Sequence, residues 1–288
     1  MIKQLTIIGV GLIGGSLARA LKRAAAVGQV VGCGRDAQHL QRALELGVID
    51  RAETDMAKAA QDADMVVVAV PVGAMEAVFG AIAPHLRADA VVTDVGSSKG
   101  SVVAAAKRAF GKLPPGFVPG HPIAGTEKSG VEASFAELFE NRRVILTPTE
   151  ASDAQAVTKV RAMWELAGAK VVETGIVHHD EVLAATSHLP HLLAFALVDT
   201  LATMDDKKEI FEYAAGGFRD FTRIASSDPQ MWHDICVHNE LALLKILDRF
   251  EADLDKLREA IANNNGDYLL TVFSRAKAAR DQLSINNS

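Results

Sequence analysis

A single histidine, His121, stands in a strongly polar stretch, GHPIAGTEKSG, which spans residues 120–130. The stretch follows an apolar pair, Phe117 and Val118, that is typical of the end of a strand. Pro122 restricts the preceding residue to an extended backbone and so holds His121 in place. A neutral imidazole has a pKa of about 6.5 and can accept a proton from a hydroxyl at physiological pH. His121 is therefore a candidate general base; the alternative is a structural histidine that is satisfied by backbone groups.

Three glycines near the N-terminus have the spacing of a turn that binds a dinucleotide. The stretch IIGVGLIGGS places Gly9, Gly11 and Gly14 after a strand-like run and before a helix-like run, which is the context that the GxGxxG pattern requires. The first glycine permits the tight turn, the second lets the backbone approach a pyrophosphate, and the third lets helix and strand pack closely. We expect Leu12 and Ile13 at the helix start to bind the cofactor as well, where backbone N–H groups are free. A glycine-rich turn without a ligand is the alternative.

The residues after the second predicted strand bear on which dinucleotide binds. An acid at this position binds the ribose 2′-hydroxyl of NAD, whereas an arginine accommodates the 2′-phosphate of NADP. The chain reads GCGRD over residues 32–36, so Gly34 leaves the acid position vacant and Arg35 follows it. This order favours NADP. If the loop is shifted by two residues, Asp36 would serve NAD instead, and both charges would also suit a solvated loop.

Two further strand ends carry residues that a nicotinamide ring would pass. In an open α/β sheet, ligands bind at the carboxyl ends of the strands. Val70 and Pro71 end one predicted strand, and Ser97 follows another in the stretch DVGSSK, residues 94–99. We predict that Val70 and Pro71 contact the cofactor. Ser97 is expected to orient the substrate hydroxyl or the imidazole of His121, and capping the next helix is its alternative role.

The elements that must position these residues alternate between strand and helix. Apolar runs bounded by glycine or proline predict strands, and longer segments rich in alanine and leucine predict the helices between them. The expected strands are residues 5–9, 30–34, 64–70, 90–95, 117–119, 143–146 and 170–173. The expected helices are residues 13–26, 37–46, 101–110 and 154–167. This alternation indicates an α/β fold of the Rossmann type, with a mostly parallel, doubly wound sheet.

The pattern changes near Gly175, which sets the predicted domain boundary. From His178 onward apolar residues recur at helical spacing, without a convincing strand. We therefore predict a dinucleotide-binding domain over residues 1–174 and an all-helical substrate and dimerisation domain over residues 175–288, frayed at residues 286–288. Its many aliphatic positions suit helix packing across a homodimer interface. The helical part runs almost to the last residue, so no appended domain is expected.

Composition limits the partners and the compartment. The chain has 288 residues, 49% of them hydrophobic, and a net charge of −6, which argues against nucleic acid as a main partner. Its two cysteines, Cys33 and Cys236, fit no zinc or CxxC spacing. The start of the chain lacks a signal-peptide cleavage pattern, and the apolar run Leu192–Val198 is far shorter than the roughly 20 residues of a membrane span. We predict a soluble, cytoplasmic protein without a membrane partner.

Two groups of histidines in the helical part raise the question of a metal. The spacing of His188 and His191 can place both on one helix face, but the sequence offers no third ligand at a fitting distance. His178, His179 and Asp180 form a richer group, which we interpret as a surface stretch that caps the start of a helix. We predict no metal site.

Five motifs together resemble those of a known enzyme family. GVGLIGGS, TDVGSSKG, GHPIAGTEKSGVEA, SHLPH and GGFRDFTRIASSDPQMW occur in this order over nearly the whole chain. They are similar to those of the prephenate and arogenate (cyclohexadienyl) dehydrogenases of tyrosine biosynthesis. The resemblance implies an oxidative decarboxylation that depends on NAD(P): the carbinol carbon of a cyclohexadiene ring loses a hydride, the ring loses CO₂, and the product is aromatic. The product would be 4-hydroxyphenylpyruvate from prephenate or tyrosine from arogenate, and the sequence does not separate the two.

The resemblance also implies roles for single residues. His121 matches the histidine that accepts a hydrogen bond or proton from the hydroxyl, and Ser97 matches the serine that orients it. Arg223 matches the arginine that binds the ring carboxylate, a contact that suits a planar guanidinium. Arg219, four residues earlier, competes for this role, and a surface ion pair is the alternative for both. The residues that the resemblance places near the substrate or its access route are Thr126, Glu127, His188 and His191.

Two other functions fit part of the pattern. A Rossmann-plus-helical oxidoreductase of the β-hydroxyacid dehydrogenase type would be expected to use a lysine base in the helical domain, whereas Lys99 lies in the first domain. A non-catalytic dinucleotide sensor would keep the glycine turn but could dispense with His121 and Arg223. The presence of both residues favours the dehydrogenase.

Overall fold

The structure is a computed structural model that describes residues 1–285. Contacts within the chain divide it into two units, Met1–Glu240 and Leu241–Ser288. The first unit contains both β-sheets and the helices that precede residue 240. The predicted frayed end, residues 286–288, lies outside the described residues.

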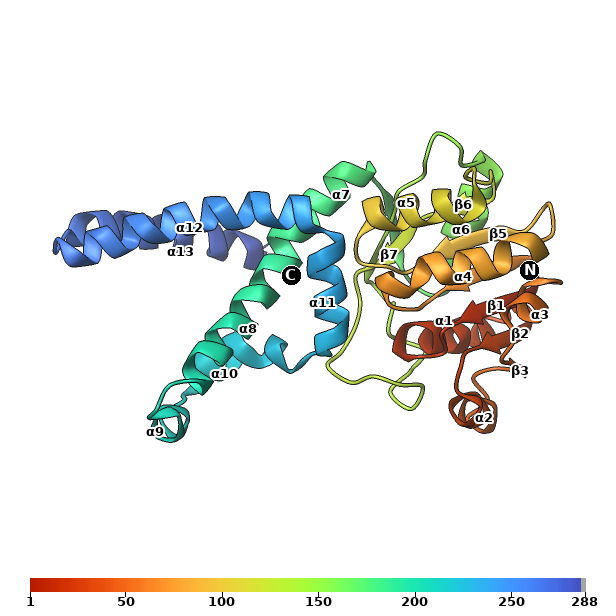
Figure 1. Ribbon diagram of the computed structural model, residues 1–288, viewed down its shortest axis with the longest axis horizontal. Helices are drawn as coiled ribbons and strands as arrows, with labels where there is room; N and C mark the ends of the chain where they lie inside the picture. The colour runs from red at the N-terminus through yellow and green to blue at the C-terminus, as the bar shows by residue number, and fades with distance from the viewer. Residues whose placement is uncertain (286–288) are drawn as a thin grey trace. The chain divides into compact units, whose positions relative to one another are not determined.

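A six-stranded parallel sheet forms the centre of the first unit (Figure 1). Its strand order is β3-β2-β1-β4-β5-β6, and every neighbouring pair is parallel. The strands are β1 Ile2–Ile8, β2 Val27–Cys33, β3 Arg51–Glu53, β4 Met65–Val68, β5 Val91–Asp94 and β6 Phe117–Val118. The strand order reverses between β1 and β4, which is where ligands bind in doubly wound sheets. The Rossmann-type parallel sheet predicted from the sequence is confirmed.

Helices cover both faces of this sheet and close a hydrophobic core on each. They are α1 Leu12–Arg23, α2 Ala37–Glu45, α3 Met56–Ala60, α4 Met75–Ile82, α5 Lys99–Phe110 and α6 Ala154–Leu166. One core contains residues of α1, α2 and α6, and the other contains residues of α3, α4 and α5, of which α4 and α5 lie side by side (Figure 1). Along β4, Met65 and Val67 enter the first core, whereas Val66 and Val68 enter the second. Because successive side chains of a strand point to opposite faces, this unbroken apolar run is a strand buried on both sides.

A second, three-stranded sheet holds the candidate base. β7 Gly120–Pro122 pairs antiparallel with β8 Arg143–Leu146, which pairs in parallel with β9 Lys170–Glu173. His121 lies opposite Ile145 in this ladder, so it belongs to a short strand of its own, after the strand that the sequence predicts at residues 117–119. Three residues that include a glycine and a proline carry no strand pattern, which is why sequence analysis misses β7.

Only helical elements follow β9 in the described part of the chain, as the sequence predicts. They are α7 Ile176–Leu183, a π-helical turn Ala184–His188, α8 Leu189–Ala202, α9 Lys207–Glu212, α10 Gly216–Thr222, a 3₁₀ turn Arg223–Ser226, α11 Pro229–His238, α12 Glu240–Ala262 and α13 Gly266–Ile285. The run Ile176–Ala202 is long and apolar enough to cross a membrane by length and composition alone. Its Asp180 side chain accepts hydrogen bonds from the backbone of α5, so this run is a core helix of the first unit.

The second unit contains α13 and nearly all of α12. Large apolar side chains on these two helices are exposed, namely Leu241, Leu244, Leu254, Ile261, Leu270 and Phe273. The division at residue 240 comes from contacts alone, and the domain boundary between residues 174 and 175 stays a prediction.

Candidate functional site

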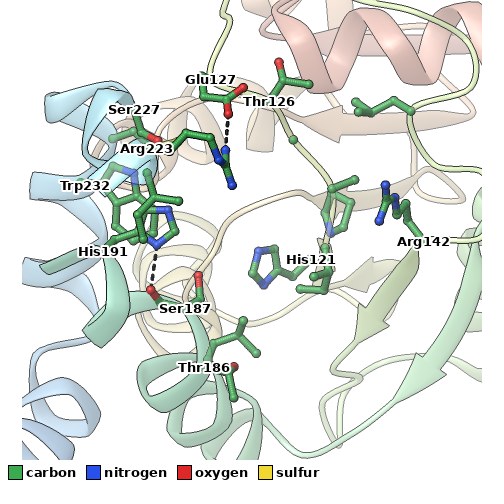
Figure 2. A pocket seen from close by; sticks show the side chains of 18 of the residues that line it. His121, Thr126, Glu127, Arg142, Thr186, Ser187, His191, Arg223, Ser227 and Trp232 are labelled. Carbon is green, nitrogen blue, oxygen red and sulfur yellow. Dashed lines mark hydrogen bonds and ion pairs between the residues drawn. The ribbon is translucent and has the colours of Figure 1, made fainter. Parts of the chain in front are cut away.

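Two adjoining cavities meet at His121. The smaller, of about 430 Å³, is lined by the glycine turn at Gly11, by the ends of β4 and β5, and by His121. The larger, of about 960 Å³, is lined by His121, His191 and Arg223 (Figure 2). A cofactor in the smaller cavity and a substrate in the larger one would therefore share the histidine.

The glycine turn leaves room for a ligand close to the backbone. Gly9 has a φ of 98°, in the left-handed region that favours glycine, and a Cβ there would lie 2.2 Å from the carbonyl oxygen of Ala69. A Cβ on Gly14 would lie 2.3 Å from the carbonyl oxygen of Gly9, so strand and helix pack closely. A Cβ on Gly11, the N-cap of α1, would meet nothing within 4 Å. The free N–H groups of the helix start thus border open space, which fits a pyrophosphate.

The other predicted cofactor contacts divide into two groups. Leu12, Ile13, Val70 and Pro71 line the smaller cavity. Arg35 and Asp36 are exposed at the end of β2 and line neither cavity. The Oδ1 atom of Asp36 caps α2 by accepting hydrogen bonds from the backbone N–H groups of Gln38 (2.8 Å) and His39 (3.1 Å). Within residues 1–285, no hydrogen bond or ion pair involves the Arg35 side chain.

His121 is held in a buried, polar junction and is only 8% exposed. The carbonyl oxygen of its neighbour Gly120 accepts a hydrogen bond of 2.6 Å from Nζ of Lys99, which also pairs with the carboxylate of Asp94. The side chains of Lys99 and Asp94 are both fully buried. Burial holds the pKa of His121 well below 6.5, and the neighbouring His179, Lys99 and His188 act in the same direction. The imidazole is therefore neutral at physiological pH, as a proton acceptor must be.

A second histidine lies directly behind His121, and sequence analysis interprets it wrongly. His179 Nε2 is 2.9 Å from His121 Nδ1, and His179 is only 1% exposed. Asp180 does cap a helix, but that helix is α5: its carboxylate accepts hydrogen bonds from the backbone N–H groups of Lys99 (2.7 Å) and Gly100 (2.8 Å). The surface cap expected at residues 178–180 is thus a buried contact between two helices, with only His178 exposed.

His188 is buried beside His179, and an asparagine orients it. Asn239 Nδ2 donates a hydrogen bond to the carbonyl oxygen of Asp180 (2.9 Å), and it lies 2.9 Å from His188 Nδ1. Because a carbonyl oxygen only accepts, the Asn239 atom is an N–H donor, and His188 Nδ1 accepts from it. The proton of neutral His188 is then on Nε2. Burial lowers the pKa of His188 to about 4.

His191 and Trp232 form one wall of the larger cavity. Their rings stack with centroids 3.6 Å apart and planes inclined by 17°. His191 Nδ1 lies 2.9 Å from the carbonyl oxygen of Ser187, which fixes the proton of the neutral ring on Nδ1 (Figure 2). Burial lowers the pKa of His191, although the hydrogen bond to Ser187 acts in the opposite direction.

Arg223 reaches the larger cavity from the start of a 3₁₀ turn and pairs with Glu127 from the loop after β7 (Figure 2). Backbone hydrogen bonding and the Arg223 guanidinium hold the pKa of Glu127 below its usual value. Thr126 and Glu127 line both cavities. Arg219, the competing arginine, lines neither cavity. Geometry therefore brings Arg223, and not Arg219, to the same space as His121.

Ser97 lines the smaller cavity together with His121 and is half-buried. The N-cap of α5 is Ser98, whose Oγ lies 2.8 Å from Oγ of Ser101. The first free N–H groups of α5 bond to Asp180, so Ser97 does not have the capping role that the sequence left open.

No group of three side chains suited to a metal ion occurs in the described part of the chain. Cys33 is buried and Cys236 is half-buried, and both are free thiols. Burial raises the pKa of Cys33 to about 11, so this thiol is inert as a nucleophile at neutral pH.

Comparison with known proteins decides the family. Residues 17–173 match the family model described as "Prephenate dehydrogenase, nucleotide-binding domain", and residues 177–275 match "Prephenate dehydrogenase, dimerization domain". This chain belongs to the prephenate dehydrogenase family. It is an oxidoreductase of tyrosine biosynthesis, a prephenate/arogenate (cyclohexadienyl) dehydrogenase, with a nucleotide-binding part followed by a helical dimerisation domain.

Three members of the family match this chain over almost the full length of both proteins. A cyclohexadienyl dehydrogenase of Zymomonas mobilis is 44% identical over 281 residues, which cover 96% of this chain and 95% of the relative. The crystal structure of prephenate dehydrogenase from Aquifex aeolicus, in complex with hydroxyphenyl propionate and NAD+, matches with a TM-score of 0.92 and 39% identity over 98% of this chain and 99% of that one. Synechocystis arogenate dehydrogenase matches with a TM-score of 0.81 and 31% identity, over 97% of this chain and 99% of that one.

Several residues at or near the cavities are not identified from the sequence. Asn239 and Arg142 carry no motif signal that separates them from surface or core residues, and Trp232, which ends the motif GGFRDFTRIASSDPQMW, is not assigned a role from the sequence; yet Trp232 and Arg142 line the larger cavity. His179 and Asp180 do stand out in the sequence as part of the group HHD. The role of this group depends on its contact with α5, which lies about eighty residues away in sequence.

Proposed function

We propose that His121 is the general base of this dehydrogenase. It lines the cofactor-side and the substrate-side cavity, and this single observation carries the proposal. Oxidation of a carbinol requires its hydroxyl proton to leave as the carbonyl forms, and a neutral, buried imidazole at that junction can accept it. Ser97, on the wall of the same smaller cavity, is in a position to hydrogen-bond the hydroxyl and orient it.

Arg223 is the proposed partner of the ring carboxylate. Its guanidinium lines the larger cavity together with His121, and one of its nitrogens is engaged by Glu127 (Figure 2). The remaining N–H donors suit the planar geometry of a carboxylate. A ring held by its carboxylate at Arg223 would present the opposite carbinol to His121. Thr126, Glu127 and His191 line the same cavity, and His188 lines the adjoining smaller one.

The proposed cofactor is NADP, with NAD as the alternative. The open space at Gly11 and the start of α1 would hold the pyrophosphate, and the nicotinamide, when bound, would supply the hydride acceptor. Two observations support NADP: Gly34 offers no carboxylate to a ribose, and the Oδ1 atom of Asp36 already caps α2. Arg35, exposed beside them, could meet a 2′-phosphate. The relative from Aquifex aeolicus was crystallised with NAD+, so the choice needs a direct test.

The enzyme is proposed to act as a cytoplasmic homodimer on a free small molecule, without a nucleic-acid or membrane partner. The description of the second family model as a dimerization domain supports the dimer, as do the exposed apolar side chains of α12 and α13. The substrate side chain, a keto acid in prephenate or an amino acid in arogenate, is left to experiment.

One assay tests reaction, substrate and cofactor together. Purified enzyme is mixed with prephenate or arogenate and with NAD+ or NADP+, in all four combinations, and the absorbance of the reduced cofactor is followed. We expect reduction with at least one substrate, and a higher kcat/KM with NADP+ than with NAD+. A higher kcat/KM with NAD+ would overturn the reading of Gly34 and Arg35. Folded protein that binds a dinucleotide but turns over neither substrate would favour the sensor.

A matched pair of variants checks the cofactor site. Arg35→Ala is expected to raise the KM for NADP+ and to leave the KM for NAD+ almost unchanged, because only NADP+ carries the 2′-phosphate. The control is Arg42→Ala, because Arg42 is also exposed but lies farther along, within α2. Equal effects of Arg35→Ala on both cofactors would contradict the assignment.

A further inference from the structure

A line of three side chains extends from the candidate base into the helical part. His121 Nδ1 lies 2.9 Å from His179 Nε2, and His179 Nδ1 lies 2.8 Å from Oδ1 of Asp180. The two imidazole rings meet edge to face, with centroids 5.1 Å apart and planes at 63°. The side chain of His179 is fully buried, so water does not compete for these contacts.

The hydrogen-bond partners of Asp180 fix where each proton lies. Its carboxylate accepts from two backbone N–H groups of α5 as well as from His179. Burial alone would raise the pKa of Asp180, but these hydrogen bonds outweigh burial and keep the pKa below its usual value. An ionised carboxylate only accepts hydrogen bonds, so His179 Nδ1 carries a proton.

The same reasoning extends to His121. In a neutral imidazole one nitrogen donates and the other accepts. In neutral His179, the proton on Nδ1 leaves the lone pair on Nε2, which then receives a hydrogen bond from His121 Nδ1. The proton of His121 is then on Nδ1, and the lone pair is on Nε2. Of the two nitrogens of the His121 ring, only Nε2 is then left to receive a substrate proton.

We propose that His179, itself held by Asp180, is a positioning residue that fixes His121 in the tautomer with its lone pair on Nε2. The inference rests on the proposed role of His121 as the base. When the substrate O–H bond breaks and an N–H bond forms at Nε2, His121 becomes an imidazolium. Its Nδ1–H then donates a charge-assisted hydrogen bond to His179, whose own proton stays directed at the Asp180 carboxylate.

Positive charges near His121 and His179 disfavour the imidazolium form of His121. The hydrogen bond to His179 that stabilises this form therefore becomes more important. Lys99 and His188 both act to lower the pKa of His121, as does His179 when it is itself protonated, and Lys99 is paired with Asp94. Asp180 is the carboxylate that contacts the far side of His179. Asp94 is already engaged by Lys99, whereas Asp180 is connected to His121 by way of the His179 ring.

The contacts of Asp180 also link the orientation of His179 to the packing of α5. Asp180 caps α5, whose first residue Lys99 binds the carbonyl oxygen of Gly120, next to His121 in β7. The same carboxylate that orients His179 therefore helps to hold the strand that carries the base. A purely structural role for His179 would need only this packing, and the test must separate the two roles.

The first experiment reads the tautomer directly in the wild-type enzyme with its dinucleotide bound. Protein labelled with ¹⁵N at histidine is studied by NMR at neutral pH, and the His121 signals are assigned by their loss in His121→Asn. We expect His121 to carry its proton on Nδ1. A proton on Nε2 would overturn the proposal without any change to His179.

The second experiment uses variants. His179→Phe removes the acceptor, and we expect kcat to fall by roughly 10- to 100-fold, with KM little changed and with the His121 proton no longer confined to Nδ1. His179→Gln supplies an amide oxygen as a substitute acceptor and should restore part of the kcat and of the Nδ1–H signal. It also serves if His179→Phe fails to fold. His178→Phe, at the exposed neighbouring histidine, is the control.

The outcomes distinguish this inference from the proposed function. If His121→Asn keeps near-normal turnover, the base is wrong, and the proposed function fails first. If His121→Asn is slow while His179→Phe keeps the wild-type kcat, His121 stays the base and the positioning role of His179 is refuted. Loss of stability without a change of tautomer in His179→Phe would likewise refute it, since packing alone predicts that result.

Discussion

Burial gives His121 its chemical character. At 8% exposure, with Lys99 and His188 nearby, a protonated imidazole is disfavoured, so the ring is neutral over the whole physiological range. A low pKa makes the ring a weaker base, and the proposed hydrogen bond from its Nδ1–H to His179 would compensate by stabilising the charge that forms during the proposed reaction. In this proposal, the site combines a permanently available acceptor with a partner for its charged form.

Substitution of Arg223 should weaken substrate binding more than turnover. Arg223→Ala removes the donors proposed to hold the ring carboxylate, so we expect KM to rise strongly, by a loss of binding on the order of 2–4 kcal/mol, with a smaller change in kcat. Steady-state kinetics against the substrate identified in the four-way assay measure both constants. Arg219→Ala, at an arginine that lines neither cavity, is the matched control and should leave KM near the wild-type value. A KM unaffected by Arg223→Ala would assign the carboxylate to another residue.

We expect the protein to be less stable in mild acid because the pKa of His188 is lower in the folded state than in the unfolded chain. Burial lowers its pKa to about 4 in the folded state, against about 6.5 in the unfolded chain. Between these pH values the unfolded chain binds a proton that the folded protein does not, so the free energy of unfolding falls as the pH falls from about 6.5 toward about 4. For this residue the loss is on the order of 3 kcal/mol.

Urea unfolding at several pH values between 7.5 and 4.5 measures this loss. His188→Gln should flatten the decline, though not abolish it, because burial lowers the pKa of His121 in the same direction. His85→Gln, at an exposed histidine, should leave the decline unchanged. An identical slope in His188→Gln and wild type would show that His188 does not contribute.

Motif types and spacing predict part of the site. The glycine turn, His121, Ser97 and Arg223 are each singled out by a pattern, and all but Arg223 border the smaller cavity or shape its turn. The sequence alone leaves Arg219 and Arg223 as rivals, since the choice depends on which side chain faces the cavity. The contacts of His179 with His121 and of Asn239 with His188 join residues that are far apart in sequence. Their roles therefore cannot be inferred from their neighbours in sequence.

At the scale of elements, strand ends are fixed by one buried ion pair. Lys99, the first residue of α5, binds Asp94 at the end of β5 and the carbonyl oxygen of Gly120 in β7. Asp94 in turn accepts hydrogen bonds from the backbone N–H groups of Gly96 (2.7 Å) and Gly120 (3.2 Å). Two sheets and one helix are therefore joined at a point adjacent to His121.

Breaking this ion pair should be costly. Lys99→Met leaves the Asp94 carboxylate buried without its cation, and we expect the free energy of unfolding to fall by about 3–5 kcal/mol. Denaturant unfolding measures this value. Addition of Asp94→Asn to Lys99→Met removes the uncompensated charge while keeping an acceptor, so the double variant should recover part of the stability. Lys256→Met, at an exposed pair with Asp253, should have a much smaller effect. Equal effects of Lys99→Met and Lys256→Met would contradict the argument.

Some elements are predicted from the sequence to within one residue, and others are missed. The predicted helix over residues 154–167 and the predicted strands over 143–146 and 170–173 agree with α6, β8 and β9 within one residue. The prediction lacks β3, α3 and α4. Two of these have five residues or fewer, and α4, MEAVFGAI, is too uniformly apolar to show a helical stripe. The π-helical turn before His188 depends on a local change of hydrogen bonding that no residue pattern announces.

At the scale of the whole molecule, the helical part presents more apolar surface than a solvated monomer needs. Leu241, Ile261 and Leu270 are 85%, 65% and 67% exposed, and α13 adds Phe273 on the same side as Leu270. A unit of two helices has little capacity to bury such residues within itself. A second copy of the chain is the partner that the family's dimerization domain indicates.

We therefore expect a homodimer whose formation depends on these side chains. Light scattering on the eluted protein should give twice the chain mass of 30.6 kDa at micromolar concentration. Phe273→Glu places a charge on the apolar side of α13 and should shift the mass toward that of one chain, because an unpaired charge is costly to bury in an interface. Ala279→Glu introduces the same charge on the opposite side of α13 and should leave the dimer intact. A wild-type monomer would refute the dimer, and a Phe273→Glu dimer would show that another surface forms it; in either case the apolar face of α13 would need a different occupant.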